Sequence, residues 1–410
     1  MQNRPPRPVA RGIQTGPPPD PKNNSNSVAI LEPMKINQTK WTRASGWMPA
    51  FDPIPSTAQL VFVFGATATF KDRALLAQIR RAHPGASILG CTTAGEICGT
   101  EVTDDSLVVT AATLAHSQVK GVSVTLGDFA GSLEAGEALA QALPPEISRP
   151  GGADPLAHVF VLSDGLKVNG SDLVAGMTKH LPGGITVTGG LAGDGARFGE
   201  TFTLWGEVVA ANSIVALGLY GSRLRVGFGS LGGWDAFGPE RLVTRSQGNV
   251  LYELDGRSAL QLYKKYLGEQ AAGLPATGLL FPLSLRRAAG ETPVVRTILN
   301  VDEAQQSMTF AGDIPEGGHV QLMKANFDRL IDGANGAAVT SHHAIGSLSA
   351  ELAVLISCVG RKLVLKQRIE EEVEGVRNVL GAGAALAGFT PTGKSRRLCR
   401  AARVNYTIRR

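Results

Sequence analysis

Short apolar runs alternate with segments of helical periodicity along most of this 410-residue chain. The run LVFVF at 60–64 precedes a helical pattern over 71–82, and a similar run at 158–162 is again followed by a helical pattern. Strands that alternate with helices build sheets with helices packed on them. The sequence therefore predicts an α/β fold with mixed sheets. The strands expected at 213–220 and 223–229 are separated by a short turn, which favours an antiparallel pair.

A glycine-containing hinge at 232–238 marks the expected boundary between two halves of the chain. Beyond it, apolar residues over 365–380 recur at steps of three and four, which predicts an amphipathic helix. The four glutamates between 370 and 374 fall largely off its apolar stripe. We expect two consecutive α/β domains, one at 34–236 and one at 237–389.

The two ends of the chain differ from its body in composition. Residues 1–27 contain seven prolines, and such a segment buries too little apolar surface to offset chain entropy. A disordered extension is therefore predicted over 1–33, with translation starting at Met34. Residues 390–410 are rich in arginine and lose the hydrophobic period. They are predicted to be an aberrant basic tail.

The start of this tail matches the phosphate-loop pattern with GFTPTGKS at 388–395. A phosphate loop joins a strand to a helix inside a nucleotide-binding domain, and here only 15 residues remain after the match, with no later strand expected. The codons offer another explanation, because those for TPTGKS can spell Ser-Tyr-Gly-Glu-Ile in a shifted frame. We expect a frameshift near Phe389.

The formal charge of +5 comes from the ends of the chain. Residues 1–27 contribute +3 and residues 389–410 contribute +7, so the body between them carries −5. A nucleic-acid-binding surface needs clustered cations with interleaved aromatic rings, which the body lacks. No apolar run approaches the roughly 18 residues that cross a bilayer. We expect no nucleic-acid or membrane partner and a cytoplasmic location.

Two similar turns follow two of the expected strands. One is GCTTAGEI at 90–97 and the other is GGLAGD at 189–194, and both contain Ala-Gly followed by an acid. In α/β sheets ligands bind outside the carboxyl ends of strands, where glycine lets backbone amides approach a ligand and an acid can hold a cationic group. The pair of turns could line a small-molecule cleft. Alternatively, the glycines serve packing and the acids are solvated.

The sequence gives little support for a zinc site, a haem site or a cysteine nucleophile. The seven histidines have no zinc-ligand spacing, and the four cysteines form no Cys-x-x-Cys pair. A haem needs only one axial histidine, for which His158, His319, His342 and His343 are better candidates than His83 and His180, which are expected at surface helix ends. Cys91 has no basic neighbour that would make it a nucleophile. It is expected to be a buried or pocket-lining thiol.

These pieces together resemble the FIST family of sensory proteins, which have an N-terminal and a C-terminal FIST domain. The resemblance covers nearly everything from Met34 to Phe389. It is most specific at four segments: GCTTAGEI at 90–97, TGGLAGD at 188–194, NVLYELDG at 249–256 and SCVGR at 357–361. Family members usually close with Tyr-Gly-Glu-Ile and a final strand, which this chain lacks in frame.

The resemblance implies a stand-alone sensor rather than an enzyme. It implies a small ligand such as an amino acid and a separate signalling partner such as a histidine kinase. Members that bind haem and sense nitric oxide make a haem sensor the alternative. A rival class is an enzyme that uses Cys91 or the carboxylates of Glu96 and Asp194. The ligand-binding residues implied by the family motifs are Cys91, Thr92, Thr93, Gly95, Glu96, Gly190 and Asp194 in the first domain and Ser357 and Arg361 in the second.

Overall fold

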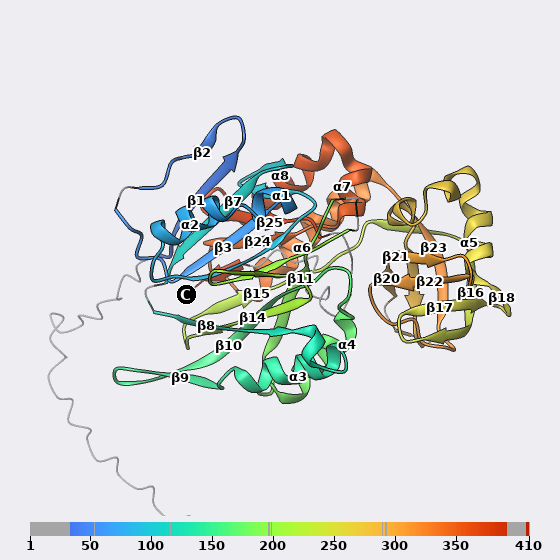
Figure 1. The fold of residues 1–410 in the computed structure, drawn as a ribbon, viewed down its shortest axis with the longest axis horizontal. Coiled ribbons are helices and arrows are strands. Elements are labelled where there is room, and N and C mark those ends of the chain that lie inside the picture. Colours follow the sequence, from blue (N-terminus) through green and yellow to red (C-terminus); the bar gives the residue numbers. More distant parts are fainter. Residues whose placement is uncertain are drawn as a thin grey trace, which may run out of the picture. The chain divides into compact units, whose positions relative to one another are not determined.

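The computed structural model describes residues 33–391, apart from residues 53, 115, 196, 198, 289 and 292, together with the backbone of residues 407–409 (Figure 1). The proline-rich extension expected over 1–33 lies outside these residues, except for Pro33. Most of the tail expected over 390–410 also lies outside them. The expectation that no strand follows the altered segment is wrong, because the backbone of 407–409 forms β26, which pairs with two other strands.

The first sheet is seven-stranded and is built around the parallel pair β3 and β4. The connection between them is α2, which begins where the Asp72 carboxylate accepts hydrogen bonds from the N–H groups of Ala74 and Leu75. It ends shortly before Pro84, which cannot continue a helix. In sheet order the strands are β13 (Val208–Ala210), β12 (Thr203–Trp205), β4 (Ser87–Thr92), β3 (Leu60–Gly65), β7 (Leu107–Thr113), β1 (Lys35–Thr42) and β2 (Gly46–Met48), with helices α1 (Thr67–Phe70) and α2 (Arg73–Ala82).

The second sheet repeats this arrangement with a parallel pair, β10 and β11, joined by α4. The Asn169 side chain caps α4 by accepting a hydrogen bond from Ser171 N. In sheet order the strands are β11 (Thr186–Leu191), β10 (Gly152–Ser163), β14 (Ser213–Tyr220) and β8 (Gln118–Thr125), with β9 (Glu146–Arg149) paired to β10, and the helices are η1 (Leu126–Asp128), α3 (Ser132–Ala142) and α4 (Gly170–His180).

The third sheet combines strands from both halves of the chain. Its parallel pair is β24 and β25, and strands β5, β6 and β15 from the first half join it. The antiparallel pair expected from 213–220 and 223–229 is wrong, since β14 pairs with β8 and β10 while β15 pairs with β26. In sheet order the strands are β15 (Arg225–Gly227), β26 (Thr407–Arg409), β24 (Leu352–Ile356), β25 (Ala385–Phe389), β5 (Glu96–Cys98) and β6 (Glu101–Thr103), with helices α6 (Phe327–Ala344), α7 (Val359–Leu365), η4 (Lys366–Arg368) and α8 (Ile369–Leu380).

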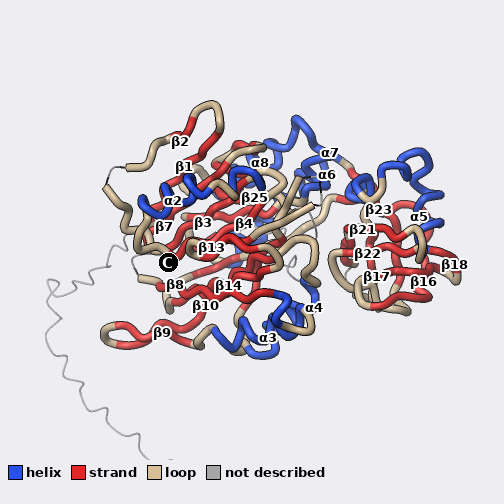
Figure 2. Tube along the Cα trace, in the orientation of Figure 1, coloured by secondary structure: helices blue, strands red, loops and turns tan. Residues whose placement is uncertain are grey.

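The fourth sheet is antiparallel, and its residues lie between the hinge and α6 in sequence. Its strands lie together in Figure 2. The hinge expected at 232–238 is wrong for most of its length, because residues 234–238 belong to strand β16, which pairs with β23. Tyr263 and Leu260 of α5 pack into its core. In sheet order the strands are β20 (Val294–Arg296), β19 (Leu283–Arg286), β23 (His319–Ala325), β16 (Trp234–Gln247), β17 (Val250–Leu254), β22 (Ser307–Phe310) and β21 (Ile298–Asp302), with β18 (Arg257–Ser258) paired to β17, and helices α5 (Ala259–Leu267), η2 (Gly268–Gly273) and η3 (Ala276–Leu280).

The three parallel pairs share one close contact. In each pair a glycine of the second strand lies opposite a residue of the first: Gly90 opposite Val63, Gly189 opposite Val161, and Gly388 opposite Leu355. A Cβ atom at these glycines would come within 1.9, 1.7 and 2.0 Å of the facing carbonyl oxygen. Only glycine permits this approach. The chain thus contains three similar strand–helix–strand units, and the predicted α/β class with mixed sheets is confirmed.

An aromatic cluster joins the three units in one core. Phe64 of β3 stacks on Phe389 of β25 with ring centroids 4.6 Å apart, and Phe62 meets Phe160 of β10 edge-on at 5.5 Å. All four rings are almost fully buried. Burial of such rings contributes several kcal/mol, by the usual value of about 25 cal/mol per Å². This packing holds the three units against one another.

Candidate functional site

The second strands of the three units end at one place, which we call the strand-end junction. Gly193 N, directly after β11, donates a hydrogen bond of 2.6 Å to the Thr92 carbonyl at the end of β4. Ala94 N donates to the carbonyl oxygen of Thr390, next to β25, at 2.6 Å, and Thr390 N donates to the Gly95 carbonyl at 2.9 Å. The two glycine-containing turns of the sequence therefore do meet, as expected for carboxyl ends of neighbouring strands.

Asp194 is bound by its own turn. Its carboxylate accepts hydrogen bonds from the Thr67 hydroxyl at 2.7 Å, from Arg197, and from the backbone N–H groups of Gly199 and Glu200 at 3.2 Å each. Burial pushes the pKa of Asp194 upward, but the hydrogen bonds from Arg197, Thr67 and the two N–H groups outweigh it and hold the pKa below its ordinary value. This carboxylate stabilises the turn and has little capacity left for a ligand.

Glu96 is also engaged internally. It is fully buried and accepts hydrogen bonds from the Thr93 hydroxyl and from both the hydroxyl and the N–H of Ser106, at 2.6 and 3.1 Å. Burial raises its pKa to about 7, against the hydrogen bonds from Ser106 and Thr93, which favour the ionised form. The hydrogen bonds of Glu96 go to Thr93 and Ser106, whereas those of Asp194 go to Thr67, Arg197 and the turn, so each carboxylate is held by its own set of donors.

The other junction residues implied by the family motifs are buried as well. Cys91 lies in the apolar core and burial raises the pKa of its thiol well above the ordinary value, which disfavours the nucleophilic thiolate. The Thr92 hydroxyl accepts a hydrogen bond from Phe202 N at 3.0 Å. A Cβ atom at Gly190 would touch Phe389, and one at Gly95 would lie 2.4 Å from Nζ of Lys362. These residues hold the junction together.

Lys362 was not identified from the sequence. Its ammonium group donates a 3.0 Å hydrogen bond to the Ala94 carbonyl and also contacts the Asp104 carboxylate. Through these contacts α7 of the second half is attached to the turn that follows β4. The only available signal was its position directly after the SCVGR segment.

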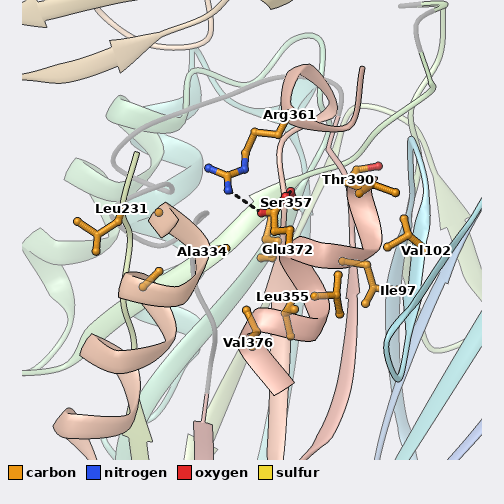
Figure 3. A pocket seen from close by; sticks show the side chains of 15 residues that line it. Ile97, Val102, Leu231, Ala334, Leu355, Ser357, Arg361, Glu372, Val376 and Thr390 are labelled. Carbon is orange, nitrogen blue, oxygen red and sulfur yellow. Dashed lines mark hydrogen bonds and ion pairs between the residues drawn. The ribbon is translucent and has the colours of Figure 1, made fainter. Parts of the chain in front are cut away.

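A cavity with a few polar groups in an apolar wall lies next to the junction, and we call it the C-half cavity (Figure 3). Its volume is about 30 Å³. Ser357 and Arg361, both implied by the family motifs, line it, and so does Glu372 of α8. The first half of the chain supplies three further wall residues, Ile97, Val102 and Leu231, and the remaining wall residues are Gly333, Ala334, Ala337, Leu355, Ile356, Ile369, Val373, Val376 and Thr390.

A buried ion pair lines this cavity. Arg361 Nη2 lies 2.9 Å from Glu372 Oε1, and both side chains are less than a tenth exposed. The Ser357 hydroxyl donates to the same carboxylate at 3.1 Å, and Arg361 also donates to the Leu330 carbonyl. Nε of Arg361 is buried and has no hydrogen-bond partner among the described residues. A buried guanidinium with an unsatisfied donor is costly unless something completes it.

The placement of Glu372 corrects the sequence analysis. The glutamates between 370 and 374 were expected off the apolar stripe, and Glu370, Glu371 and Glu374 are indeed not buried. Glu372 is only 6% exposed, because it shares a face of α8 with the buried Ile369 and Val376, and it pairs with Arg361. An acid next to the stripe of an otherwise apolar helix face was the signal that could have identified it.

Two of the histidines expected as haem ligands, His158 and His342, contact groups of the protein itself. The walls of the C-half cavity contain no histidine. Both ring nitrogens of the buried His158 contact threonine hydroxyls, of Thr186 at 2.7 Å and of Thr188. His342 contacts the Leu348 carbonyl at 3.1 Å, and His83, expected at a surface helix end, is instead 5% exposed and packs edge-on against Phe51.

Two wider surveys cover the described residues. No group of three or more His, Cys, Asp and Glu side chains is arranged to hold a metal ion there. None of the helices described is both long and apolar enough to span a membrane.

Comparison with known proteins identifies the family. The FIST N domain model matches residues 59–257 and the FIST C domain model matches residues 259–393. The chain belongs to the FIST family, so the resemblance seen in the sequence is confirmed. FIST domains are small-ligand sensing domains of signal transduction and are not catalytic.

One relative of this chain is itself uncharacterized, so it does not indicate a function. This chain is 27% identical over 206 residues to an uncharacterized protein of Methanocaldococcus jannaschii. The matched part makes up 46% of this chain and 38% of the relative. The chain thus matches well under half of the relative's length.

Proposed function

We propose that this protein senses a small zwitterion of the amino-acid type in the C-half cavity and passes the signal to a separate protein, such as a histidine kinase. The observation that carries the proposal is the buried pair of Arg361 and Glu372, which faces a cavity and leaves Arg361 Nε without a partner among the described residues. A buried polar group without a partner calls for an explanation, and a ligand group is one.

The lining groups complement both ends of an amino acid. A guanidinium offers a planar fork of donors that matches a carboxylate, so Arg361 would bind the ligand carboxylate. Glu372 would accept hydrogen bonds from the ligand ammonium group. The hydroxyls of Ser357 and Thr390 would add hydrogen bonds, and the apolar wall would receive a short side chain. Few polar groups in an apolar wall are typical of small-molecule sites.

Ligand binding requires the cavity to expand. A cavity of about 30 Å³ holds roughly one water molecule. Its walls come from α6 and α8 and from Leu231, which is 45% exposed on the segment that joins the two halves. That segment contacts α6 closely, because a Cβ atom at Gly333 would lie 1.7 Å from the Gly232 carbonyl. Expansion would therefore move α6 against this segment, and such a displacement is what a partner protein could recognise.

A thermal-shift screen of the common amino acids, followed by calorimetric titration, tests the proposal. A ligand present at about 100 times its Kd stabilises the fold by about 2.7 kcal/mol. Arg361→Lys keeps the charge and loses the fork, so we expect it to weaken binding roughly hundredfold. The matched control is Arg245→Lys, at an exposed ion pair with Glu253 of 2.8 Å. This control should bind like the wild type.

Two outcomes would overturn the proposal. One is the absence of any amino-acid response in wild-type protein that circular dichroism shows to be folded. The other is unchanged binding in Arg361→Lys. If this variant does not fold, Ser357→Ala, which removes one hydroxyl from the cavity, replaces it, and undiminished binding there has the same meaning.

Haem is not part of this proposal and stays a prediction from the family resemblance. The reason is that none of the described histidines lines the C-half cavity. An absorption spectrum of protein purified after expression with a haem precursor tests it. A stoichiometric Soret band that shifts with nitric oxide would establish the haem sensor instead.

A further inference from the structure

A cleft of about 860 Å³ lies in the first half of the chain, between α2 and the hairpin of β12 and β13. Sites for small organic molecules typically have volumes of roughly 300–1,000 Å³. The C-half cavity measures about 30 Å³, so the two sites suit ligands of different size. The cleft is lined by Lys71, Arg73, Leu76, Ala77, Ile79, Arg80, Arg81, Ile88, Phe202, Leu204, Gly206, Glu207, Val208 and Val209.

The floor of the cleft is apolar. Leu204, Ile79 and Ile88 are buried, and Phe202 and Leu76 are half-buried beside them. Val208 of the edge strand β13 is 65% exposed. Apolar surface that is concave and open to water gains free energy when an apolar ligand covers it.

The rim of the cleft is cationic. It carries Lys71, Arg73, Arg80 and Arg81 against a single acid, Glu207, although the body of the chain has a net charge of −5. Arg80 Nε lies 3.4 Å from Glu207. Lys71 contacts Glu200, just outside the cleft, and lies 4.5 Å from the centre of the Phe202 ring.

Two of these cations remain available for a ligand. Arg73 and Arg81 are exposed, and the described residues provide no acidic partner for either. They lie on α2, which has an apolar side that packs at Leu75 and Ile79. An uncompensated pair of guanidinium groups above an apolar floor favours a ligand that is negatively charged at one end and apolar along its body.

We propose that this cleft binds an amphipathic organic anion, an elongated apolar chain that ends in a carboxylate. The apolar body would cover Phe202, Leu204 and Val208, and the carboxylate would lie near Arg73 or Arg81. The proline-rich segment 1–27 is a poor occupant, because its own charge is +3. The concave volume favours a small molecule over a protein surface.

The floor of the cleft is bonded directly to the strand-end junction. Phe202 N donates to the Thr92 hydroxyl at 3.0 Å, and Thr92 N donates to the Phe202 carbonyl at 2.9 Å. The Thr92 carbonyl in turn accepts the hydrogen bond from Gly193 N. A ligand that presses on Phe202 therefore acts on the residue that joins the first two strand–helix–strand units.

Fluorescence titration with a dansyl-labelled undecanoic acid tests the proposal. We expect saturable one-to-one binding to the full chain, and we expect the uncharged dansyl-labelled alcohol to bind about tenfold more weakly. The double variant Arg73→Gln/Arg81→Gln should lose about the same factor. A matched double variant, Arg43→Gln/Arg223→Gln, changes two exposed arginines that do not line the cleft and should bind like the wild type.

Three results would overturn it: no saturable binding, equal binding of acid and alcohol, or equal loss in both double variants. Val208→Glu puts a negative charge on an exposed position of the cleft and should also weaken binding, which provides a second test if the arginine variants aggregate. The proposal is independent of amino-acid sensing. Arg361→Lys should leave dansyl-acid binding unchanged while it reduces amino-acid binding.

Discussion

Two neighbouring regions hold buried charge in different ways. At the strand-end junction, Asp194 and Glu96 accept hydrogen bonds from surrounding side chains and backbone N–H groups of the protein. In the wall of the C-half cavity, Arg361 is in direct contact with Glu372, and its Nε lacks a partner among the described residues. The comparison teaches that the conspicuous Ala-Gly-acid turns build the scaffold. The group with capacity for a ligand comes from α7 and α8.

The largest effect is expected at the junction itself. A Cβ atom at Gly193 would lie 2.7–2.9 Å from backbone atoms of Ala94, Thr390 and Thr93, which cannot move independently. We expect Gly193→Ala to lower the free energy of unfolding by about 4 kcal/mol, measured by urea denaturation. The control is Gly183→Ala, where a Cβ would meet nothing within 4 Å. Equal stability of the two variants would show that the three strand ends are not tightly packed.

Glu96 makes the stability of the junction depend on pH. Its pKa is raised from 4.5 to about 7, so the folded protein holds this proton more tightly than the unfolded chain does. The resulting stabilisation is fully present below about pH 4.5 and is lost as the pH rises through 7. Its size is about 3 kcal/mol.

The measurement is the difference in unfolding free energy between wild type and Glu96→Gln at a series of pH values. The amide does not titrate. Between pH 4.5 and pH 8 the wild type should therefore lose up to about 3 kcal/mol of unfolding free energy relative to Glu96→Gln. A difference that stays constant with pH would mean that Glu96 is not buried at the junction.

A smaller effect is expected for Asp194→Asn. The amide is similar in size to the carboxylate but cannot accept the charge-assisted hydrogen bonds from Arg197 and the turn N–H groups as strongly. We expect a loss of about 2 kcal/mol in the free energy of unfolding. Arg197→Gln should lose less, because Thr67 and the N–H groups still hold the carboxylate. An unchanged stability in both variants would contradict the scaffold role of this turn.

Much of the fold could be predicted from local sequence patterns. The strand at 60–64, the helix at 71–82 and the amphipathic helix at 365–380 correspond to β3, α2 and α8, because apolar period and prolines act locally. The third sheet could not be predicted, since β5 pairs with β25 and β15 pairs with β26 although the partner strands are far apart in the chain. Such pairing depends on tertiary packing, which a local pattern does not report.

The site was predicted only in part. The family motifs led to Ser357 and Arg361, which do line a cavity, and to the two turns, which do meet. Glu372 was missed because the side of a helix that faces a partner depends on where the neighbouring helix lies. The cationic cleft was missed because α2 and the β12–β13 hairpin are far apart in the chain.

The most direct test of the central claim is a calorimetric titration of two matched carboxylate variants with the amino acid that gives the largest thermal shift. The account predicts that Asp194→Asn is less stable but binds with the affinity of the wild type. It predicts that Glu372→Gln, which keeps the shape of the side chain and removes its charge, loses binding roughly hundredfold. Loss of binding in Asp194→Asn with full binding in Glu372→Gln would contradict the account and place the ligand at the strand-end junction.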